Sequence, residues 1–481
     1  MSNAKYYTWS ALGKLGSEIL SFTGNVLIAR VLSPDDYGLV AMLSIFIGIS
    51  MNLTDAGFND GLLRKHICSK SDYGTVATYN IIVSVIIYVL LFLLSPYIAT
   101  FYQHEELESI TKVIALSIVL KAFCLSGFVQ LTKQLRFKQS SIIANLTSLC
   151  SIVIVYVLAL CEFGYWALAV QPLVVSLFNI IFLMSIAKWK PYFCFDYTKF
   201  KEMWAFSNNL LLSYIVNQIG RNAYSVIIGK FFSPTSLGFY NQAQKMQTVP
   251  TNGLNSVVMT TSYPILAKET DLKKREKMYE NLISQYTWIL AFFAFALICA
   301  SDAVFVILLG MKWLPSAPLF KLFMLIAITY PLVTINSNIV KLQGKSNVYR
   351  NLTFLRNGLQ ILALIICGRF SLEVILYGQI IATYLSVSID IYMCGSTVGL
   401  TFIKELRLWG REVLLAFSAF LIAKSLFFFV PFISSLSIVP KSVSSTFVYI
   451  VVFIFLSEIT HNSMYYSIKE IISLTIKKLT K

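Results

Sequence analysis

Long apolar runs recur from end to end of the chain, and the short segments between them hold most of the charged residues. A helix needs roughly 20 residues to cross the hydrocarbon core of a bilayer, and the runs are long enough to do so. The pattern predicts about fourteen transmembrane helices. The predicted spans are residues 9–31, 38–58, 77–101, 109–131, 140–160, 163–187, 204–232, 238–266, 282–309, 317–340, 351–367, 371–394, 413–433 and 443–459.

Composition supports an all-α integral membrane protein. The 481 residues are 57% hydrophobic and only 13% charged, with a mean hydropathy of +0.71, which no water-soluble domain carries. The first span lacks a small-residue cleavage site and is predicted to be retained. The eight cysteines form no CxxC pair, so neither a disulfide framework nor a metal site is indicated. No catalytic or cofactor motif is found.

The placement of positive charge predicts the orientation of the chain. A net charge of +16 would suggest nucleic acid in a soluble protein, but most lysines and arginines here fall in alternate loops. The cations on the opposite side are few: Arg30, Lys112, Lys230, Lys312, Arg369 and Lys441. The positive-inside rule therefore places both termini in the cytoplasm. Apolar residues spaced through 468–479, with lysines between them, predict an amphipathic surface helix, although a solvated tail is the alternative.

An internal repeat divides the chain into two lobes. Residues 25–40 read NVLIARVLSPDDYGLV and residues 225–240 read SVIIGKFFSPTSLGFY, at a constant offset of 200. Chance similarity between apolar segments is the alternative. Because the offset covers six spans, the copies share an orientation, a layout typical of secondary transporters. The predicted organisation is two pseudo-symmetric six-helix lobes, 1–187 and 204–394, a cytoplasmic connector at 188–203, and two extra helices with the tail at 395–481.

Polar stripes run along the first, seventh and eighth spans. In the eighth span five polar residues follow steps of 4, 3, 4 and 3 and so share one helical face. Ionisable groups at membrane depth normally point into a water-filled cavity, so we expect these spans to line a cationic cleft. The alternative is hydrogen bonding between packed helices. The predicted substrate-binding cations are Lys14, Arg221 and Lys245, and the predicted polar lining is Glu18, Asn25, Asn52, Asn217, Gln218, Asn222, Asn241, Thr248, Asn252 and Asn255.

Two segments carry a family resemblance. Residues 28–65, IARVLSPDDYGLVAMLSIFIGISMNLTDAGFNDGLLRK, and residues 221–250 resemble the polysaccharide transporter family, the Wzx-type flippases of the multidrug/oligosaccharidyl-lipid/polysaccharide exporter superfamily. The resemblance implies alternating access between two lobes in a bacterial inner membrane. It also implies a substrate of undecaprenyl diphosphate carrying an oligosaccharide for O-antigen, capsule or exopolysaccharide. Relatives often have an aspartate where this chain has Tyr224, which puts any role of that carboxylate in doubt here.

Other functions remain open at this stage. A drug or metabolite antiporter of the same superfamily would share the fold but usually needs an acidic, cation-coupling site. A glycosyl polymerase or ligase would need a large outer loop with catalytic groups, and no loop before the thirteenth span provides one. A scaffold without transport would not need polar stripes. The expected partners are the bilayer and the lipid-linked oligosaccharide, with a polysaccharide polymerase and a chain-length regulator as further possibilities, and no nucleic acid. The sugar, the coupling ion and the oligomeric state do not follow from the sequence.

Overall fold

The computed structural model describes residues 3–268, 271–342, 346–395, 401–429, 437–462, 464–466 and 469–470. These residues form helices joined by short turns, and no strand occurs among them. The fold divides into two compact units, residues 1–241 (unit 1) and 242–481 (unit 2). The lobe boundaries expected from the sequence stay a prediction.

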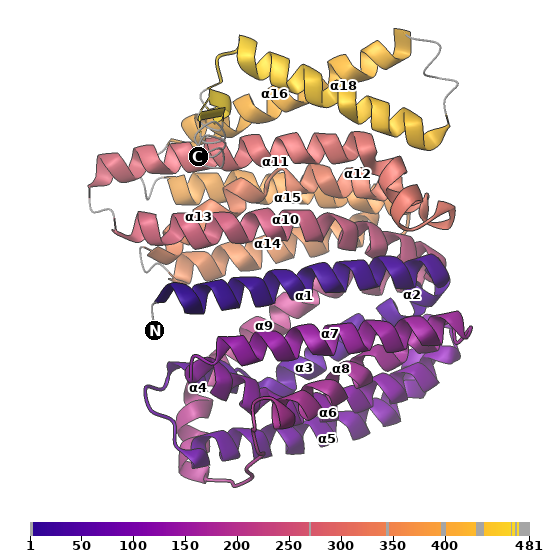
Figure 1. The fold of residues 1–481 in the computed structure, drawn as a ribbon, viewed down its shortest axis with the longest axis vertical. Helices are drawn as coiled ribbons and strands as arrows, with labels where there is room; N and C mark the ends of the chain where they lie inside the picture. Colours follow the sequence, from indigo (N-terminus) through magenta and orange to yellow (C-terminus); the bar gives the residue numbers. More distant parts are fainter. Residues whose placement is uncertain are drawn as a thin grey trace, which may run out of the picture. The chain divides into compact units, whose positions relative to one another are not determined.

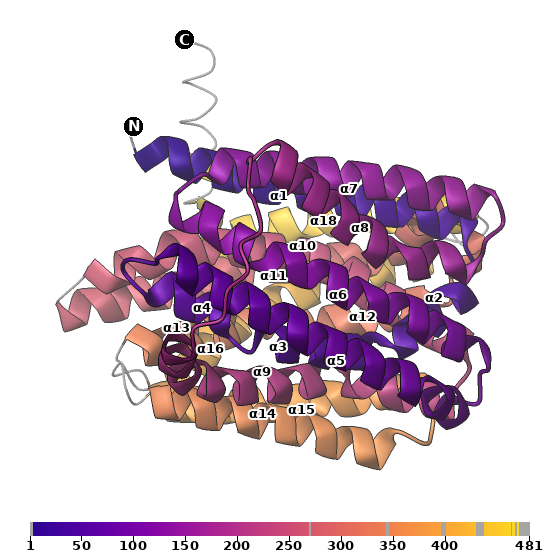
Figure 2. The ribbon, with the colours of Figure 1, turned by 90° about the horizontal axis from the view of Figure 1, so that it is seen from below.

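Unit 1 contains nine helices in the described ranges and the first turns of a tenth, as Figure 1 shows in indigo to pink. They are α1 (Asn3–Val31), α2 (Pro34–Met42), α3 (Ser44–Asp55), α4 (Phe58–Arg64), α5 (Lys70–Tyr102), α6 (Glu106–Lys133), α7 (Phe137–Leu160), α8 (Tyr165–Ser185) and α9 (Tyr197–Phe231), followed by the start of α10 (Pro234–Lys268). Helix α6 packs against α5 and α8, α7 packs against α1 and α8, and α9 packs against α3. Figure 2 shows α5 and α6 from below.

Unit 2 contains the rest of α10 and the later helices, rose to yellow in Figure 1. They are α11 (Leu272–Leu308), a 3-10 turn (Met311–Trp313), α12 (Ser316–Ala327), α13 (Tyr330–Leu342), α14 (Ser346–Cys367), α15 (Leu372–Gly395), α16 (Phe402–Phe429) and α18 (Ile438–Ile459). Helix α11 packs against α12, α16 and α18, and α15 packs against α14 and α13. A buried cluster from α11, α13 and α15, including Tyr286, Leu332 and Ile391, forms its core.

The predicted all-α membrane fold is confirmed. Each predicted span coincides with a helix or with a pair of consecutive helices. Eight helices in the described ranges are long and apolar enough to cross a membrane, or nine if the bent pair α2 and α3 is one span. Helices such as α9 and α10 fall outside that group because polar residues interrupt their apolar runs. The number of fourteen crossings therefore stays a prediction.

The second span differs from the prediction of one helix over 38–58. The structure has α2 and α3, bent by 42° around Leu43. Helix α3 then ends at Asp55, because Ala56 and Gly57 adopt left-handed conformations with φ of 46° and 77°. A left-handed residue stops a helix and turns the chain. Phe58 therefore begins a separate helix, α4.

The helix that contains the seventh span starts before the residue at which that span is predicted to begin. Helix α9 starts at Tyr197, inside the predicted connector 188–203, and the bounds of the connector stay a prediction. The side chain of Asp196 accepts hydrogen bonds from the main-chain N–H groups of Thr198, at 3.0 Å, and Lys199, at 3.3 Å. Such a cap satisfies N–H groups that the first turn leaves free, and so fixes the start of the helix. The predicted surface helix over 468–479 lies almost wholly outside the described residues.

Candidate functional site

Helix α1 presents one face to α7 and carries predicted cleft residues on another. Gly13, Gly16 and Gly24 lie against side chains of α7, where a Cβ at each would crowd Ser141, Asn145 and Ile152 respectively. Glu18 is exposed, which fits its position on a different face of the helix. The two remaining predicted residues of α1 give less information. Asn25 is buried and its carbonyl oxygen lies 3.5 Å from the Tyr37 hydroxyl, and the side chain of Lys14 lies outside the described part of the structure.

Two predicted lining residues, Asn52 and Gln218, contact the neighbouring helix where α3 packs against α9. The Asn52 side-chain amide donates to the main-chain oxygen of Tyr214 at 3.4 Å. Gln218 lies over Gly48 so closely that a Cβ there would overlap its amide. Asn222 donates to the carbonyl of its own helix, that of Gln218, at 2.9 Å. Asn52 and Gln218 therefore take part in the packing of α3 against α9, and whether these residues line a cleft stays a prediction.

Arg221 is an exposed cation of α9. It forms no ion pair with any acidic side chain that the structure describes. Asn217 is exposed one turn earlier, and residues four apart share a helical face. A guanidinium keeps its charge in any protein environment and can donate two parallel hydrogen bonds to phosphate oxygens. This face of α9 is therefore suited to an anion.

Helix α10 carries the other predicted stripe. Lys245 and Asn252 are exposed, and seven residues apart they share a face of the helix. The Thr248 hydroxyl donates to the carbonyl of Lys245 at 3.0 Å. Asn255 has a packing role, since its oxygen accepts from the hydroxyls of Thr334, at 3.0 Å, and Tyr286, at 3.4 Å.

Tyr224, at the position where the family resemblance implies an aspartate, packs against the first turns of α10. Tyr224 of α9 is buried, and its ring is stacked on that of Tyr240 with centroids 6.4 Å apart and planes at 3°. The neighbouring Ser225 hydroxyl donates to the side-chain oxygen of Asn241 at 3.4 Å. The junction of α9 and α10 in unit 1 is thus closed by packing and neutral hydrogen bonds. That the faces of α1, α9 and α10 line one cleft stays a prediction.

Unit 2 contains a buried polar network that the sequence did not reveal. The Tyr279 hydroxyl donates to Asn336 at 2.6 Å, and the Asn336 amide donates to the Glu405 carboxylate at 2.6 Å. Arg356 of α14 pairs with the fully buried Asp390 of α15 at 2.6 Å. These contacts join residues up to 69 positions apart. In the sequence, the one feature that could have indicated this network is the presence of single acidic and amide residues in helices that are otherwise apolar or basic.

Glu405 has an altered titration. It lies at the start of α16, ahead of the predicted span at 413–433. Burial raises the pKa of its carboxyl group from 4.5 to about 7, the Asp390 charge adds to the rise, and the hydrogen bond from Asn336 opposes it. Within the described residues no group of three or more histidine, cysteine or acidic side chains is arranged to hold a metal ion.

Solved structures with a similar chain path define the fold. The chain is similar to the inward closed form of the lipid II flippase MurJ, with a TM-score of 0.74 and 13% identity, over 95% of this chain and 99% of that one. It is also similar to an inward-facing multidrug resistance MATE transporter of the MOP superfamily, with a TM-score of 0.60 and 14% identity, over 79% of this chain and 94% of that one. The chain therefore has the fold of this class of helical membrane transporters.

Sequence comparison then gives the family. Residues 27–318 match the family model for polysaccharide biosynthesis protein, and the chain belongs to that family. It is 27% identical to the teichuronic acid biosynthesis protein TuaB of Bacillus subtilis, over 72% of each chain. It is 24% identical to the succinoglycan biosynthesis transport protein ExoT of Rhizobium meliloti, over 66% of each chain. The family resemblance predicted from residues 28–65 and 221–250 is confirmed.

Proposed function

We propose that this protein is a flippase for a lipid-linked oligosaccharide, and that it moves undecaprenyl-diphosphate-linked units from the cytoplasmic to the periplasmic leaflet. The observation that carries the proposal is the combination of the polysaccharide biosynthesis family with a transporter fold over nearly the whole chain. The protein would act in the inner membrane with both termini in the cytoplasm and would not be an enzyme. A polysaccharide polymerase and a chain-length regulator are proposed partners.

The mechanism we propose is alternating access, with charge attraction at the diphosphate. An anion leaves water for a membrane protein only if cations replace its lost hydration. Arg221, Lys245 and Lys14 are proposed to supply them. Arg221 is the principal candidate, because it is exposed on its helix and, among the described residues, has no carboxylate partner. The lysines act as compact charges without the planar fork of arginine.

Export complementation with single substitutions tests this proposal. Arg221→Ala should abolish glycan export while the protein stays in the membrane, and Arg221→Lys should restore it in part, because the charge returns without bidentate geometry. Lys245→Ala should weaken export less. Arg350→Ala is the matched control, since Arg350 is an exposed arginine outside the predicted stripes. The effect of Lys14→Ala should depend on whether Glu18 is intact, because the lost lysine leaves an unpaired acid.

The control experiment is to delete the gene and identify the lipid-linked glycan that accumulates on the cytoplasmic face. Normal export by Arg221→Ala would show that the cationic mechanism is wrong. If deletion changed drug susceptibility and left glycans unchanged, the antiporter alternative would replace the flippase.

A further inference from the structure

The two copies of the internal repeat begin their second helices in the same way. In the first copy, the Ser33 hydroxyl accepts from the N–H of Asp36 at 3.2 Å, and the Asp36 carboxylate accepts from the N–H of Ser33 at 2.8 Å. In the second copy, the Ser233 hydroxyl accepts from the N–H of Ser236 at 3.2 Å. Each serine is followed by a proline, which suits the first helical position. The Ser-Pro motif thus fixes the starts of α2 and α10 as rigid, equivalent ends.

These two ends touch each other reciprocally within unit 1. A Cβ on Gly38 would lie 1.8 Å from the carbonyl oxygen of Pro234, and a Cβ on Gly238 would lie 1.9 Å from the carbonyl oxygen of Pro34. Real atoms do not approach so closely, so only glycine fits at either position while the other chain segment stays in place. Glycine allows such a close approach of two backbones, as in closely packed membrane helices.

A third contact lies between equivalent residues of the two copies. The Thr235 hydroxyl donates to the Asp35 carboxylate at 3.0 Å, and these residues are 200 positions apart. When a two-fold axis relates two surfaces, each contact between different residues occurs twice, once on each side of the axis. Residues that lie close to the axis contact their own equivalents. The Gly38–Pro234, Gly238–Pro34 and Asp35–Thr235 contacts follow this pattern.

Buried residues pack next to this contact, but the contact itself contributes little stability. Leu237 and Met42 beside it are buried. The Tyr102 hydroxyl donates to the carbonyl of Met42 at 3.1 Å, and the ammonium of Lys230 donates to the carbonyl of Phe101. Among Pro34, Asp35, Gly38, Pro234, Thr235 and Gly238, the hydrogen bond that the structure describes between the copies is the exposed one from Thr235 to Asp35, and an exposed hydrogen bond contributes little on its own. Such a surface can separate and close again without damage to either end.

We propose that this reciprocal contact, which we call the glycine clasp (Pro34, Asp35, Gly38, Pro234, Thr235 and Gly238), is a closure that must open in every transport cycle. The inference rests on the proposed alternating-access function. The distribution of positive charge places both copies on the outer face, so the clasp would seal the periplasmic side while the substrate enters from the cytoplasm. The internal repeat therefore serves to make one self-complementary seal from two copies of one motif.

Cross-linking tests whether the clasp must open. Asp35→Cys and Thr235→Cys are combined in a functional variant whose eight native cysteines are replaced, and each single variant is the control. Oxidation of the pair should reduce glycan export at least tenfold, and reduction should restore it, while the single variants export normally throughout. If the pair cross-links completely and export continues, the clasp does not need to open. If it never cross-links, the two copies do not meet in the membrane, and the proposal is also wrong.

A second measurement does not depend on transport and uses glycine variants. Gly38→Ala and Gly238→Ala should force the ends apart and speed the labelling of Thr235→Cys by an impermeant thiol reagent by about tenfold, because overpacking disfavours the closed state. Gly253→Ala is the matched control, since Gly253 lies on the same helix α10 and a Cβ there meets nothing within 4 Å. Equal labelling in Gly38→Ala and Gly253→Ala would overturn the proposal.

The two tests also separate a failure of the clasp from a failure of the proposed function. Applying the reagent separately to right-side-out and inside-out vesicles makes the labelling result independent of the orientation. If Arg221→Ala abolishes export and the locked clasp does not, the clasp proposal alone is wrong. If gene deletion causes no lipid-linked glycan to accumulate, the proposed substrate is wrong, while the labelling and cross-linking results still decide the clasp.

Discussion

Removing the carboxylate of Asp390 should destabilise unit 2 strongly. Its side chain is fully buried, and one of its oxygens accepts from two nitrogens of Arg356, at 2.7 and 2.6 Å. Hydrogen bonds to charged groups contribute roughly 1.5–3 kcal/mol each. Arg356 is only 19% exposed, so Asp390→Ala would leave a cation largely buried and without its partner. We therefore expect a loss of about 3–5 kcal/mol in the free energy of unfolding.

The assay is equilibrium unfolding in mixed micelles of increasing sodium dodecyl sulfate, followed by tryptophan fluorescence. Glu108→Ala is the matched control, because it breaks the exposed pair between Glu108 and Lys112, whose side chains are 42% and 30% exposed. Surface pairs are worth about 0–1 kcal/mol. The double variant Arg356→Met with Asp390→Leu should recover most of the loss, since apolar packing can replace a buried ion pair.

The comparison also has a result that would refute the reasoning. If Asp390→Ala costs no more than Glu108→Ala, the buried ion pair contributes nothing beyond a surface pair. If the double variant is as unstable as Asp390→Ala, the loss comes from packing volume and not from an unpaired charge. A pairwise interaction requires that the double variant be more stable than the sum of the two single changes predicts.

Two further predictions concern protonation and topology. The raised pKa of Glu405 means that the folded protein keeps a proton that the unfolded chain releases between pH 4.5 and about 7. The contribution of Glu405 to the free energy of unfolding should therefore be greatest below pH 4.5 and fall by about 3 kcal/mol as the pH rises through 7. Glu405→Gln should remove this slope in unfolding measured from pH 4 to 8, and an unchanged slope would assign it to another group. Cysteines at Lys70, Arg136, Lys273 and Lys345 should be shielded from an impermeant thiol reagent in intact cells while one at Glu106 is labelled, and labelling at Lys273 from outside would reverse the orientation.

The sequence was informative wherever local chemistry decides the structure. Apolar runs predicted the helices. The start of α2 also follows from local chemistry, because the Ser33 side chain caps the helix and Pro34 takes its first position. The bend after Met42 was missed because no proline or glycine lies at Leu43. Helix α9 starts at Tyr197, ahead of the predicted span, and an apolar run does not show how far a helix extends beyond its span.

Contacts between distant helices could not be predicted. The stripe on the seventh span contains Arg221 and Asn222 side by side, yet Arg221 is exposed whereas Asn222 bonds its own helix. Both residue types suit a cleft and a helix interface, so helical spacing alone could not separate them. The link from Asn336 to Glu405 joins α13 to α16 across 69 positions. Such pairs depend on how helices pack, which a single sequence does not specify.

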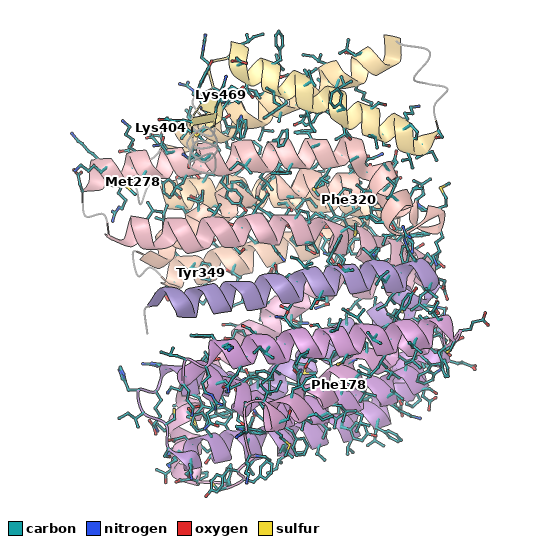
Figure 3. The ribbon with its side chains drawn as sticks, in the orientation of Figure 1. Phe178, Met278, Phe320, Tyr349, Lys404 and Lys469 are labelled. Atoms are coloured by element: carbon teal, nitrogen blue, oxygen red, sulfur yellow. The ribbon has the colours of Figure 1, made fainter. Side chains whose placement is uncertain are left out.

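Helix α11 offers a practical advantage for structure determination. Its 37 residues amount to about 55 Å, whereas the hydrocarbon core is about 30 Å thick, so part of the helix must extend beyond it. The ammonium of Lys404 forms ion pairs with Glu276, at 2.9 Å, and with Glu280, at 2.5 Å, in the first turns of α11. Figure 3 shows Lys404 near Met278 at this end of the helix. Small membrane proteins give electron micrographs that are hard to align, because the micelle hides their features. An antibody fragment raised against the ion-paired first turns of α11 would add a feature outside the micelle, by which the particle images can be aligned.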